Sequence, residues 1–334
     1  MKGSLCHELE VGLPAGEIWE VYGTLRLARL AVELLPNILQ KADIVHGDGG
    51  VGTVLHLTFP PGNPGPQYYK EKFTKVDNDN YVKEAVVIEG GYLELGFTSY
   101  LVRFEIVKKD GDSSVIRSSI EYEIDDENAG NASFVTTGPL VSIAEAISSH
   151  LMKQKSAGLV PINGQIKDQK KEAMKGSVCH ELDTDLPVDE LWAVYGTLRL
   201  VQLAAELLPN IVQKVSTVHG DGEVGTVIQV NFVPGIPGPP YQKEEFVKVD
   251  NENRVKEAKV IEAGFLLFGF QSYLMRFEIV KKDNDSSVIR STVEYEIDDE
   301  HASNASLVTT DLVATIAQVI AKYLKDQKSS PPSS

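Results

Sequence analysis

The chain has 334 residues, of which 42% are hydrophobic and 24% are charged, and its formal net charge is −16 at pH 7. A chain of this length and hydrophobicity can bury two cores of ordinary domain size. Nucleic acids and anionic membrane surfaces attract proteins through concentrated basic charge, and no stretch of eighteen apolar residues is present to span a bilayer. We therefore expect two globular domains, with neither nucleic acid nor membrane as a partner.

The sequence contains two similar copies of one long segment. MKGSLCHELEVGLP at Met1–Pro14 returns as MKGSVCHELDTDLP at Met174–Pro187, and RFEIVKKD, DSSVIRS and EYEIDDE recur at the same offset. An offset of roughly 173 residues is far too long for a solenoid repeat and suits a whole domain. The repeat predicts a first domain at 1–156, a linker at 157–173, a second domain at 174–326 and a disordered tail at 327–334.

In chain order, the first copy is predicted to contain a strand, two short helices, further strands and a long closing helix. Residues 3–12 alternate well enough for a strand, and two short helical patterns follow and end at Pro36. From 42 to 126, strand-type runs are separated by turn clusters such as DGGVG, PPGNPGP and DNDN, which predicts six more strands. Apolar residues at helical spacing then predict a helix within 131–155.

The second copy repeats this order and closes with a helix predicted over 304–325. Antiparallel strands with one long amphipathic helix must bury the apolar stripe of that helix against one face of the sheet. The pattern therefore predicts an α+β fold in each copy, with a curved sheet around a helix. Curvature of this kind often leaves a cavity.

Neither a metal site nor a secreted location is indicated. The chain contains no CxxC or HExxH motif, and His46 and His219 stand alone. Each copy holds a single cysteine, Cys6 or Cys179, so no disulfide can form within a copy. The opening residues contain no uninterrupted apolar segment of secretory type. We therefore expect a cytoplasmic location and no metal.

Three motifs, in the same order as the predicted elements, resemble a family. They are GDGGVGTV at Gly47–Val54, YKEKF at Tyr69–Phe73 and IEGGYLELG at Ile88–Gly96. Together they are similar to the plant pathogenesis-related class ten, or Bet v I, proteins and especially to their norcoclaurine and norbelladine synthase branch. The resemblance implies two tandem helix-grip domains. Each would be a seven-stranded antiparallel sheet around a long C-terminal helix, with two short helices closing one end of a hydrophobic cavity.

The resemblance also implies a reaction. Norcoclaurine synthases condense dopamine with 4-hydroxyphenylacetaldehyde to an iminium that closes on the catechol ring, a Pictet–Spengler reaction, and norbelladine synthases join tyramine to 3,4-dihydroxybenzaldehyde. The expected partners are a small aromatic amine and an aldehyde, or another hydrophobic plant metabolite. No cofactor is expected, because the imine is its own electron sink. Two alternatives stay open: imine formation of the norbelladine type, and non-catalytic binding as a carrier or as a sensor of the abscisic acid type.

Two ionisable residues are the candidates for acid–base chemistry. Tyr69, Glu71 and Phe73 share one face of a predicted strand, so burial between two aromatic rings would raise the pKa of Glu71. Lys83 shares a face with apolar residues of the next strand, so desolvation would lower its pKa. A hairpin register with Glu71 and Lys83 opposite or diagonal would oppose both shifts. The simpler interpretation is a solvent-facing ion pair between them, worth at most about 1 kcal/mol.

The resemblance assigns roles to residues of the first copy. Lys83 matches the general acid and Glu71 the general base, while Tyr69, with Tyr68 beside it, is expected to position the aromatic substrate. Val102 stands where norcoclaurine synthases carry an aspartate that helps to handle the amine and the catechol. This departure puts full norcoclaurine synthase activity in doubt. The norbelladine branch also lacks the aspartate, and it places its tyrosine one residue earlier, at the position of Tyr68.

The second copy keeps part of this set. Lys256, Glu244 and Tyr241 occupy the positions of the acid, the base and the outer tyrosine, whereas Gln242 replaces the inner tyrosine. We therefore expect a weaker or differently selective site in the second copy. The ligand contacts expected from the resemblance are the phenylalanine after each glutamate and the residue at each aspartate position: Phe73, Val102, Phe246 and Met275.

Overall fold

The computed structural model describes residues 1–62, 66–158, 173–236 and 238–329. The chain divides near Gly176 into two compact units that correspond to the two copies. Residues 159–172 of the predicted linker and 330–334 of the predicted tail lie outside the described residues. The closing helices run to Gly158 and Ser329, so each extends into a segment predicted to be linker or tail.

The described residues of the first copy contain the predicted strands and helices in the predicted order. The strands are β1 (Lys2–Val11), β2 (Lys41–His46), β3 (Val54–Thr58), β4 (Tyr68–Asp77), β5 (Val82–Gly90), β6 (Phe97–Lys108) and β7 (Ser114–Ile124). The helices are α1 (Ala15–Tyr22), α2 (Arg26–Leu34) and α3 (Gly138–Gly158), with the 3-10 segments η1 (Gly91–Leu95) and η2 (Asp126–Phe134).

The described residues of the second copy repeat this order. The strands are β8 (Met174–Thr184), β9 (Val212–His219), β10 (Val227–Phe232), β11 (Tyr241–Asp250), β12 (Val255–Ala263), β13 (Phe270–Lys281) and β14 (Ser287–Ile297). The helices are α4 (Val188–Tyr195), α5 (Arg199–Leu207) and α6 (Asp311–Ser329), with the 3-10 segments η3 (Gly264–Phe268) and η4 (Asp299–Leu307). The α+β prediction is confirmed for both copies.

The closing helices begin about two turns later than their sequence patterns predict. α3 begins at Gly138 and α6 at Asp311, and each is preceded by a 3-10 segment that carries the first part of the pattern. Pro139 occupies the first turn of α3, where the N–H group that proline lacks has no partner within a helix in any case. The sequence pattern therefore locates each helix correctly but not its first residue.

One segment of the second copy, Glu300–Lys328, is long and apolar enough to cross a membrane by length and composition alone. This segment includes α6, whose Val313, Ala317 and Ile320 are buried in the structure. Their spacing is that of the core-facing stripe of an amphipathic helix. The core helix of a globular domain meets the same criteria of length and composition, so they are weak evidence for a membrane span.

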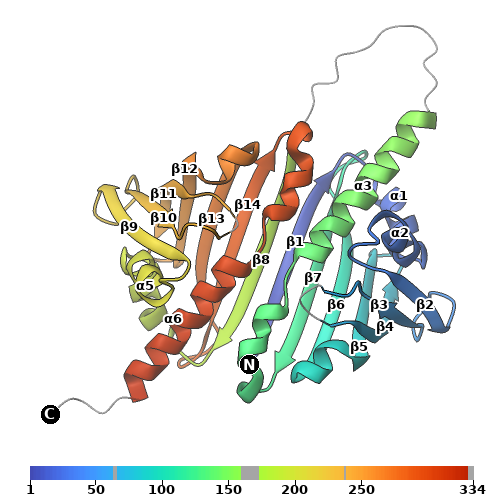
Figure 1. The fold of residues 1–334 in the computed structure, drawn as a ribbon, viewed down its shortest axis with the longest axis horizontal. Helices are drawn as coiled ribbons and strands as arrows, with labels where there is room; N and C mark the ends of the chain where they lie inside the picture. Colours follow the sequence, from blue (N-terminus) through green and yellow to red (C-terminus); the bar gives the residue numbers. More distant parts are fainter. Residues whose placement is uncertain (63–65, 159–172, 237, 330–334) are drawn as a thin grey trace, which may run out of the picture. The chain divides into compact units, whose positions relative to one another are not determined.

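In each copy the strands follow one another across an antiparallel sheet. The order is β2-β3-β4-β5-β6-β7-β1 in the first copy and β9-β10-β11-β12-β13-β14-β8 in the second. β4 is irregular, because its register with β5 shifts between Lys70 and Glu71 and again between Phe73 and Lys75. Such shifts bend a strand and increase its twist. Figure 1 shows α3 lying across the sheet of the first copy, with α1 and α2 beside it.

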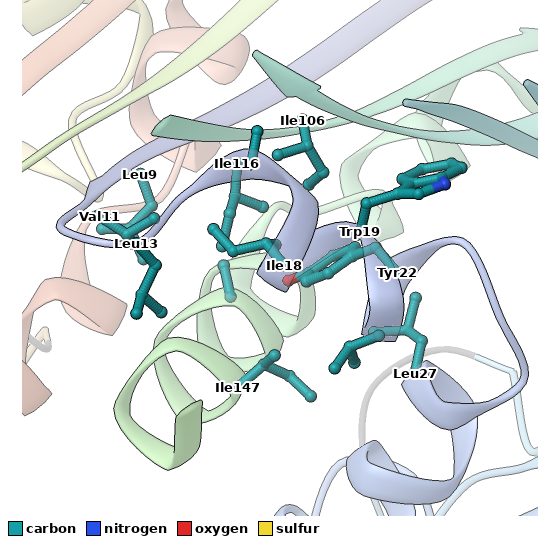
Figure 2. Close-up of a cluster of buried hydrophobic side chains, with 13 residues drawn as sticks. Leu9, Val11, Leu13, Ile18, Trp19, Tyr22, Leu27, Ile106, Ile116 and Ile147 are labelled. Carbon is teal, nitrogen blue, oxygen red and sulfur yellow. The ribbon is translucent and has the colours of Figure 1, made fainter. Parts of the chain in front are cut away.

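The core of the first copy fixes α1 and α3 against the sheet. Figure 2 shows Ile18 and Tyr22 of α1 between Ile106 and Ile116 of the strands and Ile147 of α3. All five side chains are at most 2% exposed. Complete burial of a side chain of this size contributes about 1.5–3 kcal/mol relative to exposure. This cluster fills one part of the space between sheet and helix, and the cavity lies in another.

Candidate active site

A cavity of about 360 Å³ lies in the first copy between the sheet, α2 and α3. Its wall is mostly apolar, with Leu27 and Ala31 from α2, Leu55 from β3, and Leu140 and Ile143 from α3. A space of this size with apolar walls suits one small molecule or two small fragments. The cavity predicted from a curved sheet around a helix is confirmed in this copy.

Strand β4 presents three of the predicted site residues to the cavity. Tyr69, Glu71 and Phe73 all line it, as the alternation of side chains along a strand requires. Tyr68 lies on the other face, where its side chain is 37% exposed and its hydroxyl contacts the Glu94 carboxylate at 3.4 Å. Tyr68 therefore lies apart from the three residues that line the cavity, as the alternation of side chains along a strand requires, and its role in positioning the substrate stays a prediction.

Lys83 of β5 also faces the cavity, and it is only 4% exposed. Its ammonium donates a hydrogen bond to the backbone carbonyl of Thr24 at 3.1 Å and lies 4.1 Å from the centroid of the Phe73 ring. The ring face attracts a cation through its quadrupole, and more strongly where water is excluded. These contacts hold the charge inside the copy and contradict the interpretation of a solvent-facing ion pair.

Glu71 and Lys83 do not pair across the hairpin. Glu71 lies opposite Val87 and Lys83 lies opposite Val76, so the predicted opposite or diagonal placement is wrong. One register shift of β4, between Phe73 and Lys75, falls between these two pairs, and the ring of Phe73 lies on the face that Glu71 and Lys83 share. No ion pair joins the two groups in the part of the chain that the structure describes. Both groups face the cavity instead.

Burial decides the proton affinity of both groups. Desolvation raises the pKa of Glu71 from 4.5 to about 7, and attraction to Lys83 opposes only part of this shift. Desolvation lowers the pKa of Lys83 from 10.5 to about 8, and Glu71 opposes it in the same way. The cost of burying charge therefore exceeds the mutual attraction at both sites. Near neutral pH, Glu71 can accept a proton and Lys83 can donate one.

A cluster of phenols beside Glu71 goes beyond the sequence prediction. The rings of Tyr92 and Tyr100 stack with centroids 3.9 Å apart, and Tyr69 lies 6.4 Å from Tyr92. Burial raises the pKa of Tyr69 and Tyr100 well above 10, so both stay neutral and can donate or accept hydrogen bonds. At Gly91, φ is +60° and a Cβ would lie 2.7 Å from that of Tyr69, so glycine lets η1 approach β4.

The position of Tyr100 in the cavity wall could have been predicted from the sequence. Tyr100 precedes Val102 by two residues on β6, so the two side chains share a face, and both line the cavity. Val102 lies opposite Ala85 and gives the cavity an apolar surface at this position.

Across the described residues, no group of three or more His, Cys, Asp or Glu side chains is arranged to hold a metal ion. The acid–base groups that line the cavity are therefore Glu71, Lys83 and the phenols.

The second copy brings four corresponding side chains together on β11 and β12. Gln242, Glu244, Phe246 and Lys256 are all less than 9% exposed. Lys256 repeats the contacts of Lys83, with its ammonium 2.9 Å from the Thr197 carbonyl oxygen and 3.9 Å from the Phe246 ring centroid. Burial lowers the pKa of Lys256 to about 8. The acid position is therefore built alike in both copies.

The base position of the second copy has different surroundings. The amide nitrogen of Gln242 donates a hydrogen bond of 2.7 Å to the Glu244 carboxylate. Burial raises the pKa of Glu244, while Gln242 and Lys256 oppose the shift. Tyr241 lies on the other face of β11, where its hydroxyl donates to Glu262 at 3.2 Å, and its predicted role stays a prediction. Met275 is buried, at 8% exposed.

An antiparallel sheet around a long helix defines a helix-grip domain, which is present here in two copies, and in the first copy a cavity lies between the sheet and the helix. The chain belongs to the pathogenesis-related protein Bet v 1 family, which matches residues 1–154 and 173–327. Both predicted domains are therefore family members, and the recognition made from the three motifs is confirmed.

Named relatives are similar to one copy at a time. Norbelladine synthase of Narcissus pseudonarcissus is 56% identical over 156 residues, which cover 47% of this chain and 96% of that protein. S-norcoclaurine synthase 2 of Papaver somniferum is 45% identical over 157 residues, which cover 46% of this chain and 68% of that protein. A solved structure of norcoclaurine synthase from Thalictrum flavum, in complex with dopamine and hydroxybenzaldehyde, is 44% identical, covers 46% of this chain and 88% of that chain, and has a TM-score of 0.43.

Proposed function

We propose that this chain is an enzyme that catalyses a norcoclaurine synthase-like Pictet–Spengler condensation, joining an arylethylamine such as dopamine to an aryl aldehyde. One observation carries the proposal: Glu71 and Lys83 face one apolar cavity, with pKa values of about 7 and about 8. A passive carrier of apolar molecules gains nothing from burying two ionisable groups, which costs free energy. The similarity to norcoclaurine and norbelladine synthases supports the same reaction class.

The first half of the reaction needs an acid. The amine nitrogen adds to the aldehyde carbon and gives a carbinolamine. Lys83 protonates the carbinolamine hydroxyl, which leaves as water, so that an iminium cation and a neutral Lys83 remain. The carbonyl of Thr24, 3.1 Å from the ammonium, holds the lysine in place for this transfer.

The second half needs a base. Glu71 takes the phenol proton as a carbon of the same ring bonds to the iminium carbon. Loss of the ring proton restores aromaticity. Of the two protons released, one returns to the phenol oxygen and the other to Lys83. The net change is amine and aldehyde to cyclic amine and water. The hydroxyls of Tyr69, Tyr92 and Tyr100 suit hydrogen bonding to hydroxylated rings on either substrate.

A second candidate ends at the imine, as in a norbelladine synthase-like condensation of tyramine with 3,4-dihydroxybenzaldehyde. Val102 favours it, because the cavity has an apolar side chain where norcoclaurine synthases have an aspartate that handles the amine and the catechol. The 56% identity with norbelladine synthase favours it as well. Imine formation requires the acid Lys83, whereas only ring closure requires Glu71 to take protons from the phenol and the ring.

The test is product formation by the purified chain from dopamine or tyramine with a panel of aryl aldehydes. Chiral chromatography separates the enzymatic cyclic product from racemic background, and reduction with cyanoborohydride traps imine. An enantiomeric excess that Lys83→Ala removes establishes the Pictet–Spengler reaction in the first copy, and loss only in Lys83→Ala/Lys256→Ala assigns it to both. Catalysed imine without cyclic product supports the second candidate. Uncatalysed rates in every variant would leave a binding protein.

A further inference from the structure

The two copies keep the same acid but differ around the base. In the first copy, no described group donates a hydrogen bond to the Glu71 carboxylate, which lines the cavity. In the second copy, the buried amide of Gln242 donates to the Glu244 carboxylate at 2.7 Å. Both partners of that bond are at most 7% exposed. The second copy therefore holds its carboxylate where the first copy leaves it open to a ligand.

Residue type and strand geometry explain the difference. Gln242 and Glu244 lie two residues apart on β11 and share a face, so the amide of Gln242 reaches the carboxylate. Tyr69 has the same position relative to Glu71, but its ring packs 5.1 Å from that of Phe59. Among the described contacts, no hydrogen bond joins the Tyr69 hydroxyl to the Glu71 carboxylate.

Contacts on the other side of Gln242 fix its amide. The amide oxygen lies against η3, where a Cβ on Gly264 would come within 2.9 Å of it. Phe265, in the place of Tyr92, stacks on Tyr273 with ring centroids 4.4 Å apart. The second copy thus retains the ring stack that Tyr92 and Tyr100 form in the first copy, but it lacks the hydroxyl of Tyr92. The amide thus lies between η3 on its oxygen side and the Glu244 carboxylate on its nitrogen side.

We propose that Gln242 is a positioning residue that restrains Glu244, so that the second copy forms the imine but closes the ring more slowly than the first copy. This inference rests on the proposed function. Lys256 keeps the contacts of Lys83, so the acid-dependent release of water is unaffected. The donated hydrogen bond stabilises the ionised carboxylate and makes it a weaker base for the phenol and ring protons.

The experiment isolates the second copy in the full chain by Lys83→Ala and then adds Gln242→Leu, which removes the donor. We expect the kcat for cyclic product to rise about tenfold with little change in KM, while the rate of trapped imine stays the same. Gln242→Tyr, which installs the residue of the first copy, is expected to act in the same direction. Unchanged ring closure in both variants would overturn the proposal.

The reciprocal exchange provides matched controls in the first copy. In a Lys256→Ala background, Tyr69→Gln is expected to slow ring closure and to move the acidic limb of its pH profile to lower pH. Tyr69→Phe removes the hydroxyl without adding an amide, and we expect it to leave the acidic limb in place. Equal shifts of the limb in both variants would contradict a specific effect of the amide.

A readout without turnover separates this inference from the proposed function. Carbon-13 NMR of chain labelled at the glutamate carboxyls follows the titration of Glu71 and Glu244 directly. We expect Glu244 to titrate at lower pH than Glu71 and its pKa to rise in Gln242→Leu. If Gln242→Leu leaves the pKa of Glu244 unchanged, the inference is refuted, even if the enzyme is active. Absence of any product from the wild-type chain would instead refute the proposed function.

Discussion

The ammonium of Lys83 lies 4.1 Å from the ring centroid of Phe73, and Lys256 and Phe246 repeat the contact at 3.9 Å. In each copy the phenylalanine follows the glutamate by two residues on the same strand face. The ring attracts the ammonium but carries no charge that could neutralise it. The arrangement therefore allows acid and base to face one cavity without forming an ion pair.

Replacement of the Phe73 ring should lower the pKa of Lys83, the general acid. In Phe73→Leu, the lost cation–π attraction, about 2 kcal/mol where water is excluded, should lower the pKa of Lys83 by about 1.5 units. The alkaline limb of the activity profile should move to lower pH by the same amount. Profiles measured with Lys256→Ala as the background report on the first copy alone. An alkaline limb that stays in place would mean that the ring does not support the charge.

The pH dependence of kcat/KM should be a narrow bell. Activity should rise as Glu71 loses its proton with a pKa of about 7, and should fall as Lys83 loses its proton with a pKa of about 8. Because the two groups interact, the limbs report macroscopic values of the pair. Glu71→Gln should abolish most ring closure but leave imine formation, which requires only Lys83, largely unchanged. A flat profile for the wild-type chain between about pH 6 and about pH 9 would contradict these assignments.

The residue at the aspartate position should decide the balance between imine and cyclic product. Val102→Asp places a carboxylate in the cavity, where it can pair with an amine or iminium, and should raise the share of cyclic product. Burial of this charged group without a partner should cost about 3–5 kcal/mol of folding free energy, measured by urea denaturation. Val102→Asn, with similar shape and no charge, is the control. An equal gain from both variants would show that the charge is not responsible.

Strand β4 shows how much of this site the sequence predicts. The shared face of Tyr69, Glu71 and Phe73 follows from the two-residue period of a strand, which is a local property. The register with β5 does not, because it is set by the turn, which pairs Asp77 with Val82 and so places Lys83 opposite Val76 rather than Glu71. The final pKa values depend on distances and burial that only the folded chain defines.

The phenol cluster shows another limit of sequence-based prediction. Tyr92 lies in a short 3-10 segment, which has no long periodic pattern to reveal its direction, and its stack with Tyr100 joins two elements. The hydrogen bond between Gln242 and Glu244 is similar, since the replacement of tyrosine is visible in the sequence but the contact is not.

The cytoplasmic location stays a prediction.

Buried histidines should make the chain sensitive to acid. His7 and His180 are at most 1% exposed, and neither ring nitrogen of either has a hydrogen-bond partner. Burial lowers the pKa of each from 6.5 to about 4, so the unfolded chain binds protons more readily between these values. The stability contribution is complete above about pH 6.5 and is lost as the pH falls toward about 4. From about pH 7 to about pH 5, each histidine should cost about 2 kcal/mol.

Urea denaturation of the wild-type chain and of His7→Gln/His180→Gln at several pH values tests this. The raised pKa of Glu71 acts in the opposite direction, because its folded state takes up a proton as the pH falls, so only the difference between variant and wild type isolates the histidines. The variant should gain stability relative to wild type as the pH falls. His46→Gln, at an exposed position, should not. A difference between the double variant and wild type that stays constant over this pH range would show that the buried histidines do not control acid stability.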